Sequence, residues 1–97
     1  MSSLTLAVQS YDATIRLYND NLRRKYIALT LYLEARHNYE VACTSGSIGS
    51  IRIGLLKKIK KDAALDFIAM SLITNEGLVA VDHAMYQIEL IRSMESN

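Results

Sequence analysis

Apolar and aromatic residues recur at alternating spacings of four and three along the first half of the chain. The positions are Leu4, Val8, Tyr11, Ile15, Tyr18, Leu22, Lys25, Leu29, Tyr32, Arg36, Tyr39 and Cys43, and ten of these twelve are apolar or aromatic. Such a stripe is typical of the face on which one long helix meets another. Because no glycine or proline interrupts it, the pattern predicts one helix, or two nearly collinear helices, over residues 4–43, with Ser2 or Ser3 as the N-cap.

Small and hydroxylated residues interrupt the pattern clearly once, from Thr44 to Ser50, where two glycines favour a turn. Ser50 then suits the N-cap of a second helix, which we expect from Ile51 to about Ile73. The run Thr74-Asn75-Glu76-Gly77 predicts a second, weaker break. A third helix is expected from Leu78 to about Met94.

The small number of helix-breaking residues limits the possible fold classes. The 97 residues include four glycines and no proline, too few for many short strands and turns. We therefore expect a single all-α domain over residues 1–97, in which a long N-terminal helix packs against one kinked helix or two shorter ones. This arrangement would be a helical hairpin or a three-helix bundle. In a chain this small either would leave apolar surface exposed, so completion by oligomerisation, most simply a homodimer, is expected.

The stripe of residues 4–43, which we call the predicted seam, is the first candidate site. Its members Tyr11, Ile15, Tyr18, Lys25, Leu29, Tyr32, Arg36 and Tyr39 could bind another protein, because tyrosine offers a large, stiff contact area with a polar end. The same residues could equally form an ordinary core seam. The charges at Lys25 and Arg36 are irregular there, and each favours a carboxylate as its complement.

Charge is segregated along the chain although the total is +1. Residues 51–61 carry five basic and no acidic side chains, whereas residues 62–97 carry one basic and six acidic ones. The basic face consists of Arg52, Lys57, Lys58, Lys60 and Lys61, and we expect it to lie opposite an apolar arc of Ile48, Ile51, Leu55, Leu56 and Ile59. This face could be an ordinary solvated helix surface. It could also bind an acidic protein, the acidic C-terminal third of the chain, phosphate or a membrane surface.

Catalytic and cofactor signatures are weak. Glu34 and His37 have the Glu-x-x-His spacing of di-iron helical bundles, but no second matching set of ligands follows, so no metal site is expected. No nucleophile, phosphate-binding loop or cofactor motif is evident, and we expect no enzyme activity and no cofactor. The lone Cys43 favours a reducing compartment, and the longest nearly apolar run, Ala63–Ile73, is shorter than the ~20 residues that span a bilayer. We expect a cytoplasmic protein without a transmembrane segment.

These patterns together favour a small, non-enzymatic helical protein-protein interaction module of adaptor, chaperone or inhibitor type that self-associates. One alternative is a nucleic-acid-binding regulator that uses the basic segment 52–61. A second alternative is a peripheral membrane protein that uses the amphipathic helix.

Overall fold

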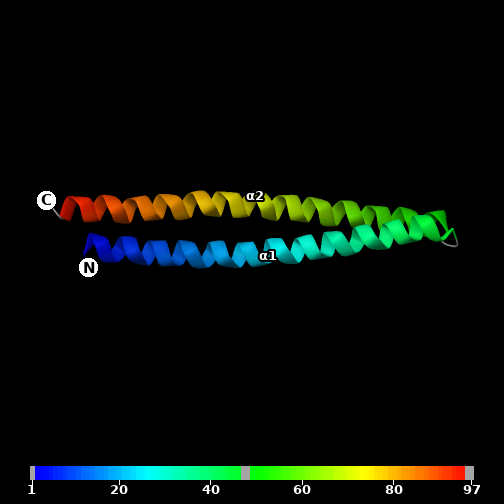
Figure 1. Cartoon of the computed structure of the whole chain (residues 1–97), viewed down its shortest axis with the longest axis horizontal. Helices are drawn as coiled ribbons and strands as arrows, with labels where there is room; N and C mark the ends of the chain where they lie inside the picture. The colour runs from blue at the N-terminus through cyan, green and yellow to red at the C-terminus, as the bar shows by residue number, and fades with distance from the viewer. Residues whose placement is uncertain (1, 47–48, 96–97) are drawn as a thin grey trace. The chain divides into compact units, whose positions relative to one another are not determined.

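A computed structural model describes residues 2–46 and 49–95 and shows two long helices packed as a hairpin (Figure 1). Helix α1 covers Ser3–Ser45, 43 residues, and helix α2 covers Ser50–Glu95, 46 residues. Of the residues described, only Ser2, Gly46 and Gly49 lie outside these helices. The predicted all-α class is therefore confirmed.

Local hydrogen bonds explain where α1 begins and ends. The Ser2 Oγ accepts a hydrogen bond from the Thr5 amide at 3.1 Å, so Ser2 is the N-cap. The sequence indicates either Ser2 or Ser3 for this role. At the other end, Gly46 has a φ of 69°, the left-handed conformation that glycine adopts readily just after a helix. The helix therefore ends at Ser45.

The N-cap of α2 differs from the expected one. The carbonyl oxygen of Gly49 accepts hydrogen bonds from the amides of Arg52 and Ile53, each at 3.1 Å. Gly49 is thus the N-cap, and Ser50 is already helical. Of the predicted turn over residues 44–50, Ser47 and Ile48 lie outside the described residues.

The predicted break at residues 74–77 is wrong, because α2 continues through it to Glu95. Thr74 is only 3% exposed, and its hydroxyl donates a hydrogen bond to the carbonyl oxygen of Asn21 at 3.5 Å. Gly77 faces Tyr18, and a Cβ built at Gly77 would lie 3.4 Å from the Tyr18 Cδ2. A glycine costs a helix only about 1 kcal/mol relative to alanine, so these packing contacts keep the segment helical. The separate third helix from Leu78 is accordingly absent from the described chain.

The chain divides into two compact units, and each unit contains one segment of α1 and one segment of α2. Unit 1 contains residues 1–22 and 72–97, and unit 2 contains residues 23–71. Within each unit the two stretches lie side by side and run in opposite directions (Figure 1). In unit 2 the stretches are consecutive along the chain and are joined by the connection between the helices.

Small residues form the most buried part of the helix pair. The buried apolar side chains are Ala28, Ala35 and Ala42 of unit 2, and Val81 and Ala84 of unit 1. The three alanines of α1 are seven residues apart, so they lie on one side of that helix. Alanine lets two helix backbones approach closely, and it also buries little apolar area. The internal core is therefore modest.

The buried side of α2 follows one uninterrupted spacing of three and four. Its members, all buried or half-buried, are Ile53, Leu56, Lys60, Ala63, Phe67, Met70, Thr74, Gly77, Val81, Ala84, Ile88 and Ile91. We call this set the α2 seam. Thr74 and Gly77 stand at regular positions within it, which explains why they do not end the helix.

Candidate interaction surfaces

In unit 1 the predicted seam residues of α1 face α2 of the same chain. Tyr11, Ile15 and Tyr18 are each half-buried. Tyr18 packs against Gly77, where the absence of a side chain leaves room for the ring. These residues therefore contribute to internal packing, and the partner helix that the stripe predicted is α2 of the same unit.

In unit 2 most of the predicted seam has the same internal role. Lys25, Leu29, Tyr32 and Tyr39 are half-buried, whereas Arg36 is exposed. The Arg36 Nε lies 3.8 Å from a carboxylate oxygen of Glu40, one helical turn away, and its guanidinium lies 5.9 Å from the centre of the Tyr32 ring. The carboxylate expected for Arg36 is thus supplied by the same helix. Exposed pairs of this kind contribute little stability.

Lys60 does not lie on the exposed basic face where the sequence placed it. It belongs to the α2 seam, and its Nζ lies 4.5 Å from the centre of the Tyr39 ring, within the range of a cation-π contact. A hydrogen bond with Cys43 raises the pKa of Tyr39, with charge repulsion from Cys43 and partial desolvation as smaller causes. Lys60 is therefore engaged within unit 2.

The remaining basic residues do form an exposed set. Arg52, Lys57, Lys58 and Lys61 are all exposed. The apolar arc predicted opposite them is only partly internal, because Leu56 lies in the α2 seam while Ile51, Leu55 and Ile59 are exposed, Ile51 by 83%. Ile48 lies outside the described residues. The N-terminal part of α2 thus exposes both basic and apolar side chains to solvent.

The sequence reading missed a second apolar pattern, on the side of α2 that faces away from the seam. Leu65, Leu72, Val79 and Tyr86 are seven residues apart and are exposed by 55%, 60%, 69% and 58%. Each lies two residues after one seam position and five after another, which places it roughly 140–160° around the helix from the seam. We call this set the outer ridge, with Leu65 in unit 2 and the other three residues in unit 1.

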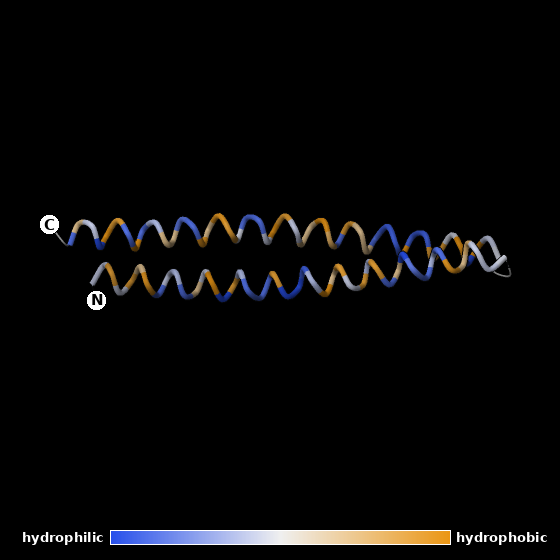
Figure 2. The backbone as a smooth tube through the Cα atoms, in the orientation of Figure 1, coloured by the Kyte–Doolittle hydropathy of each residue, from blue (hydrophilic) through white to orange (hydrophobic). Residues whose placement is uncertain are grey.

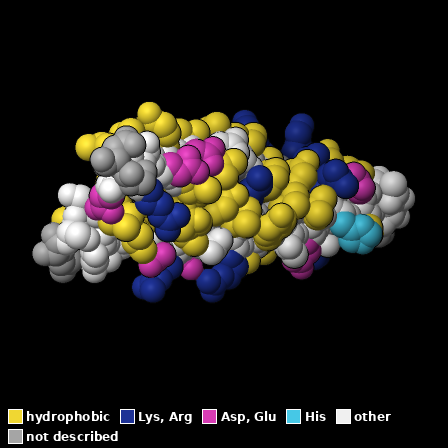
Figure 3. Space-filling model, turned by 60° about the vertical axis from the view of Figure 1, so that its left-hand side comes forward, with side chains coloured by type: hydrophobic (Ala, Val, Ile, Leu, Met, Phe, Trp, Pro, Cys, Tyr) yellow, Lys and Arg dark blue, Asp and Glu magenta, His cyan; other side chains and the backbone are white. Residues whose placement is uncertain are grey.

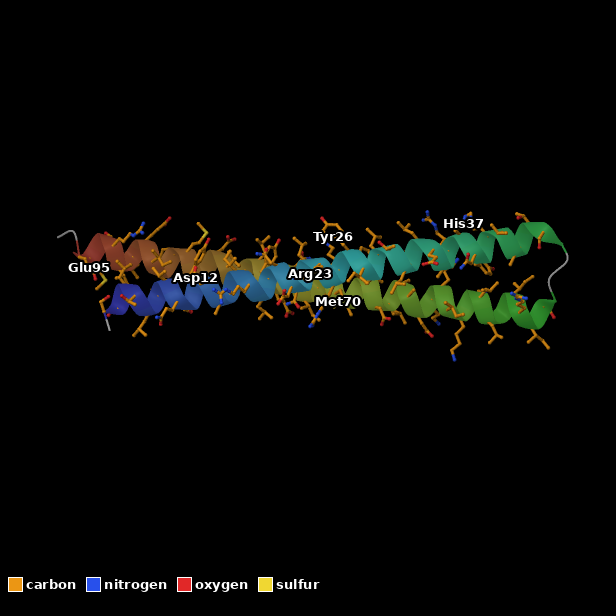
Figure 4. The ribbon with its side chains drawn as sticks, turned by 90° about the horizontal axis from the view of Figure 1, so that it is seen from below. Asp12, Arg23, Tyr26, His37, Met70 and Glu95 are labelled. Atoms are coloured by element: carbon orange, nitrogen blue, oxygen red, sulfur yellow. The ribbon has the colours of Figure 1, made fainter. Side chains whose placement is uncertain are left out.

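Helix α1 lacks an equivalent ridge. The positions of α1 that face away from α2 are Gln9, Arg16, Arg23, Thr30, His37 and Thr44, all polar and all exposed. Figure 4 shows His37 on the side of α1 away from α2. The hydropathy colouring in Figure 2 shows how often apolar residues recur along α2, and Figure 3 shows hydrophobic side chains over much of the visible face. Helix α1 also exposes large apolar residues, among them Leu17, Tyr26 and Ile27, but not along the line opposite its buried side.

A shallow groove of about 390 Å³ lies between the two helices of unit 2. Alanines 35 and 63 form part of its lining, Leu31 and Ile59 add larger apolar side chains, and carboxylates and an amide complete it. The polar members of the lining are Glu34, Asn38, Asp62 and Asp66. Such a shallow, partly apolar groove can receive apolar side chains of another helix.

The described residues contain no cluster of side chains that could bind a metal ion. No group of three or more His, Cys, Asp and Glu side chains within residues 2–46 and 49–95 is placed to hold a metal ion. His37 and Glu34 are both exposed. By length and composition, α2 is long and apolar enough to cross a membrane, and only 11% of its most apolar window is buried. Burial against α1 therefore accounts for only part of the apolar character of α2.

Comparison with protein-family models, curated proteins and solved structures found no match to this chain.

Proposed function

We propose that this protein is a small, non-enzymatic helical interaction module that self-associates and acts through its exposed apolar helix faces, as an adaptor, chaperone or inhibitor does. The observation that carries the proposal is the outer ridge of α2, whose four large apolar side chains are each more than half exposed. Large apolar side chains that share one exposed helix face often mark a binding surface in soluble proteins. The large exposed area, together with the modest alanine-rich core, favours assembly over a free monomer.

The proposal can be tested by affinity capture from the native source, followed by mass spectrometry. The bait would be the tagged wild-type chain, compared with the Leu72→Gln/Val79→Gln variant of the outer ridge. A Leu17→Gln variant is the matched control, because Leu17 is 62% exposed and lies in unit 1, but on α1. We expect the wild type and the control to retain the untagged chain or another protein, and the ridge variant to lose it. Equal recovery with all three baits would contradict the proposal.

A peripheral membrane role is a second candidate. Two observations favour it: Ile51, Leu55 and Ile59 are exposed beside the basic residues of α2, and α2 is apolar enough to enter a bilayer. Flotation with liposomes of mixed neutral and anionic lipids tests this candidate. Binding that survives the Leu72→Gln/Val79→Gln change but disappears with Ile51→Gln and Leu55→Gln would support it, and absence of flotation would exclude it.

A nucleic-acid-binding role rests on the charge of unit 2, which contains nine basic and four acidic side chains. Neutralisation of phosphates by such residues makes affinity fall steeply as salt rises. Titration of labelled single- and double-stranded oligonucleotides at two salt concentrations tests this role. A steep loss of affinity with salt, removed by Lys57→Glu and Lys58→Glu, would favour it over binding through the apolar ridge.

A further inference from the structure

The outer face of α2 changes its charge from one unit to the other. In unit 1 the ridge residues Leu72, Val79 and Tyr86 have exposed carboxylates at neighbouring positions, namely Glu76, Asp82 and Glu89. In unit 2 the exposed apolar residues Leu55 and Leu65 are accompanied by Lys57, Lys58 and Lys61, with Asp62 and Asp66 offsetting two of these charges. The outer side of α2 is thus apolar and acidic in unit 1, whereas in unit 2 it is mainly basic, with Leu65 as its ridge residue and Lys58 one heptad before it.

The complete units have the same opposition of charge. Unit 1 contains two basic and six acidic side chains, a net charge of −4, and unit 2 contains nine basic and four acidic ones, a net charge of +5. A surface that complements unit 1 must be apolar and basic, whereas one that complements unit 2 must be apolar and acidic. A second copy of the chain offers both surfaces.

We propose that the outer face of α2 binds a second copy of itself in antiparallel orientation, so that unit 1 of each chain meets unit 2 of the other. This inference rests on the proposed self-association and adds its surface and direction. The outer ridge supplies the apolar contact, and the charges select the direction. Parallel pairing would place the lysines of one copy beside those of the other and the carboxylates beside carboxylates, which is repulsive.

A bilayer fits the same face less well. The carboxylates of Glu76, Asp82 and Glu89 are distributed beside the ridge in unit 1, and burying such groups in hydrocarbon is costly. They would also be repelled by anionic lipid headgroups, which attract only the basic stretch of unit 2. A second chain accommodates both signs of charge.

Charge reversal distinguishes the two orientations. One variant carries Lys57→Glu, Lys58→Glu and Lys61→Glu, a second carries Glu76→Lys, Asp82→Lys and Glu89→Lys, and a third carries all six changes. Antiparallel pairing predicts that each triple reversal raises the dimer dissociation constant by about tenfold or more, since like charges then meet at both ends of the dimer. It also predicts that the six-fold variant recovers the wild-type value within about threefold. Circular dichroism confirms that each variant remains helical.

Sedimentation equilibrium at low and moderate salt provides these constants. Unchanged dimerisation in the triple reversals, or failure of the six-fold variant to recover, would overturn the antiparallel contact. The Val79→Gln change should weaken the dimer, whereas Leu17→Gln should not; equal effects would show that the dimer uses another face. A monomeric wild-type chain would also overturn this inference, whereas the interaction-module proposal would then depend on the capture of other proteins by the outer ridge.

Discussion

Two residues, Gly77 and Thr74, explain why α2 is one continuous helix. Glycine has a low helix propensity, yet Gly77 lies within α2 and so close to Tyr18 that an added Cβ would be 3.4 Å from the Tyr18 Cδ2. Thr74 is buried and directs its hydroxyl to the Asn21 carbonyl oxygen. The packing of these two residues outweighs their low intrinsic helix propensity.

The glycine at position 77 gives the first prediction. Gly77→Ala should raise the free energy of unfolding by up to about 1 kcal/mol, because alanine favours the helix and its Cβ would make an ordinary contact with Tyr18. Gly77→Leu should instead lower it by about 1–3 kcal/mol through overpacking. Gly54 is the control, because nothing lies within 4 Å of a Cβ built there. Urea denaturation that gives the same result for Leu at positions 54 and 77 would contradict the Tyr18 contact.

The second prediction separates Lys60 from its neighbour Lys58. Both changes, Lys60→Gln and Lys58→Gln, remove one positive charge from the same helix. Only Lys60 is half-buried over the Tyr39 ring, so only Lys60→Gln should lower the melting temperature measurably. Equal melting temperatures for the two variants would show that the contact with Tyr39 contributes nothing to stability.

At the scale of the helices, the sequence pattern predicted α1 well and α2 only in part. The tyrosine stripe identified the buried side of α1, because large side chains at heptad spacing are easy to recognise. It missed the alanines at 28, 35 and 42, which are the most buried residues of that helix. The α2 seam was missed because it passes through Lys60, Thr74 and Gly77, three residues that resemble exposed or helix-breaking positions. The outer ridge is defined by its position opposite the α2 seam. A sequence pattern that does not reveal the seam therefore does not reveal the ridge.

The alanine positions of α1 provide the third prediction. Ala42 is 2% exposed, so Ala42→Leu should lower the free energy of unfolding by about 1–3 kcal/mol, because the helices cannot separate to admit the larger side chain without losing contacts. Ala13 is exposed on the same helix, and Ala13→Leu should change stability by no more than about 0.5 kcal/mol. Thermal unfolding followed at 222 nm measures both. A well-tolerated leucine at position 42 would contradict close packing at this site.

For the whole molecule, the balance between core and surface is the main physical constraint. The described core consists of four alanines, one valine and one buried threonine, supported by half-buried side chains. The outer ridge of α2 carries large apolar residues, whereas the buried side chains are alanines, one valine and one threonine. A small domain with this distribution gains stability when another surface covers the outer ridge.

The most direct test of this account is sedimentation equilibrium of the wild-type chain at micromolar concentration, beside the Leu72→Gln/Val79→Gln variant. We predict a mass of twice 10.9 kDa for the wild type and a shift toward the monomer for the variant, because the two changes remove apolar contacts at the outer ridge. The Leu17→Gln control should remain dimeric. A wild-type mass of 10.9 kDa at every concentration would contradict the central claim that the outer ridge is covered by a second copy.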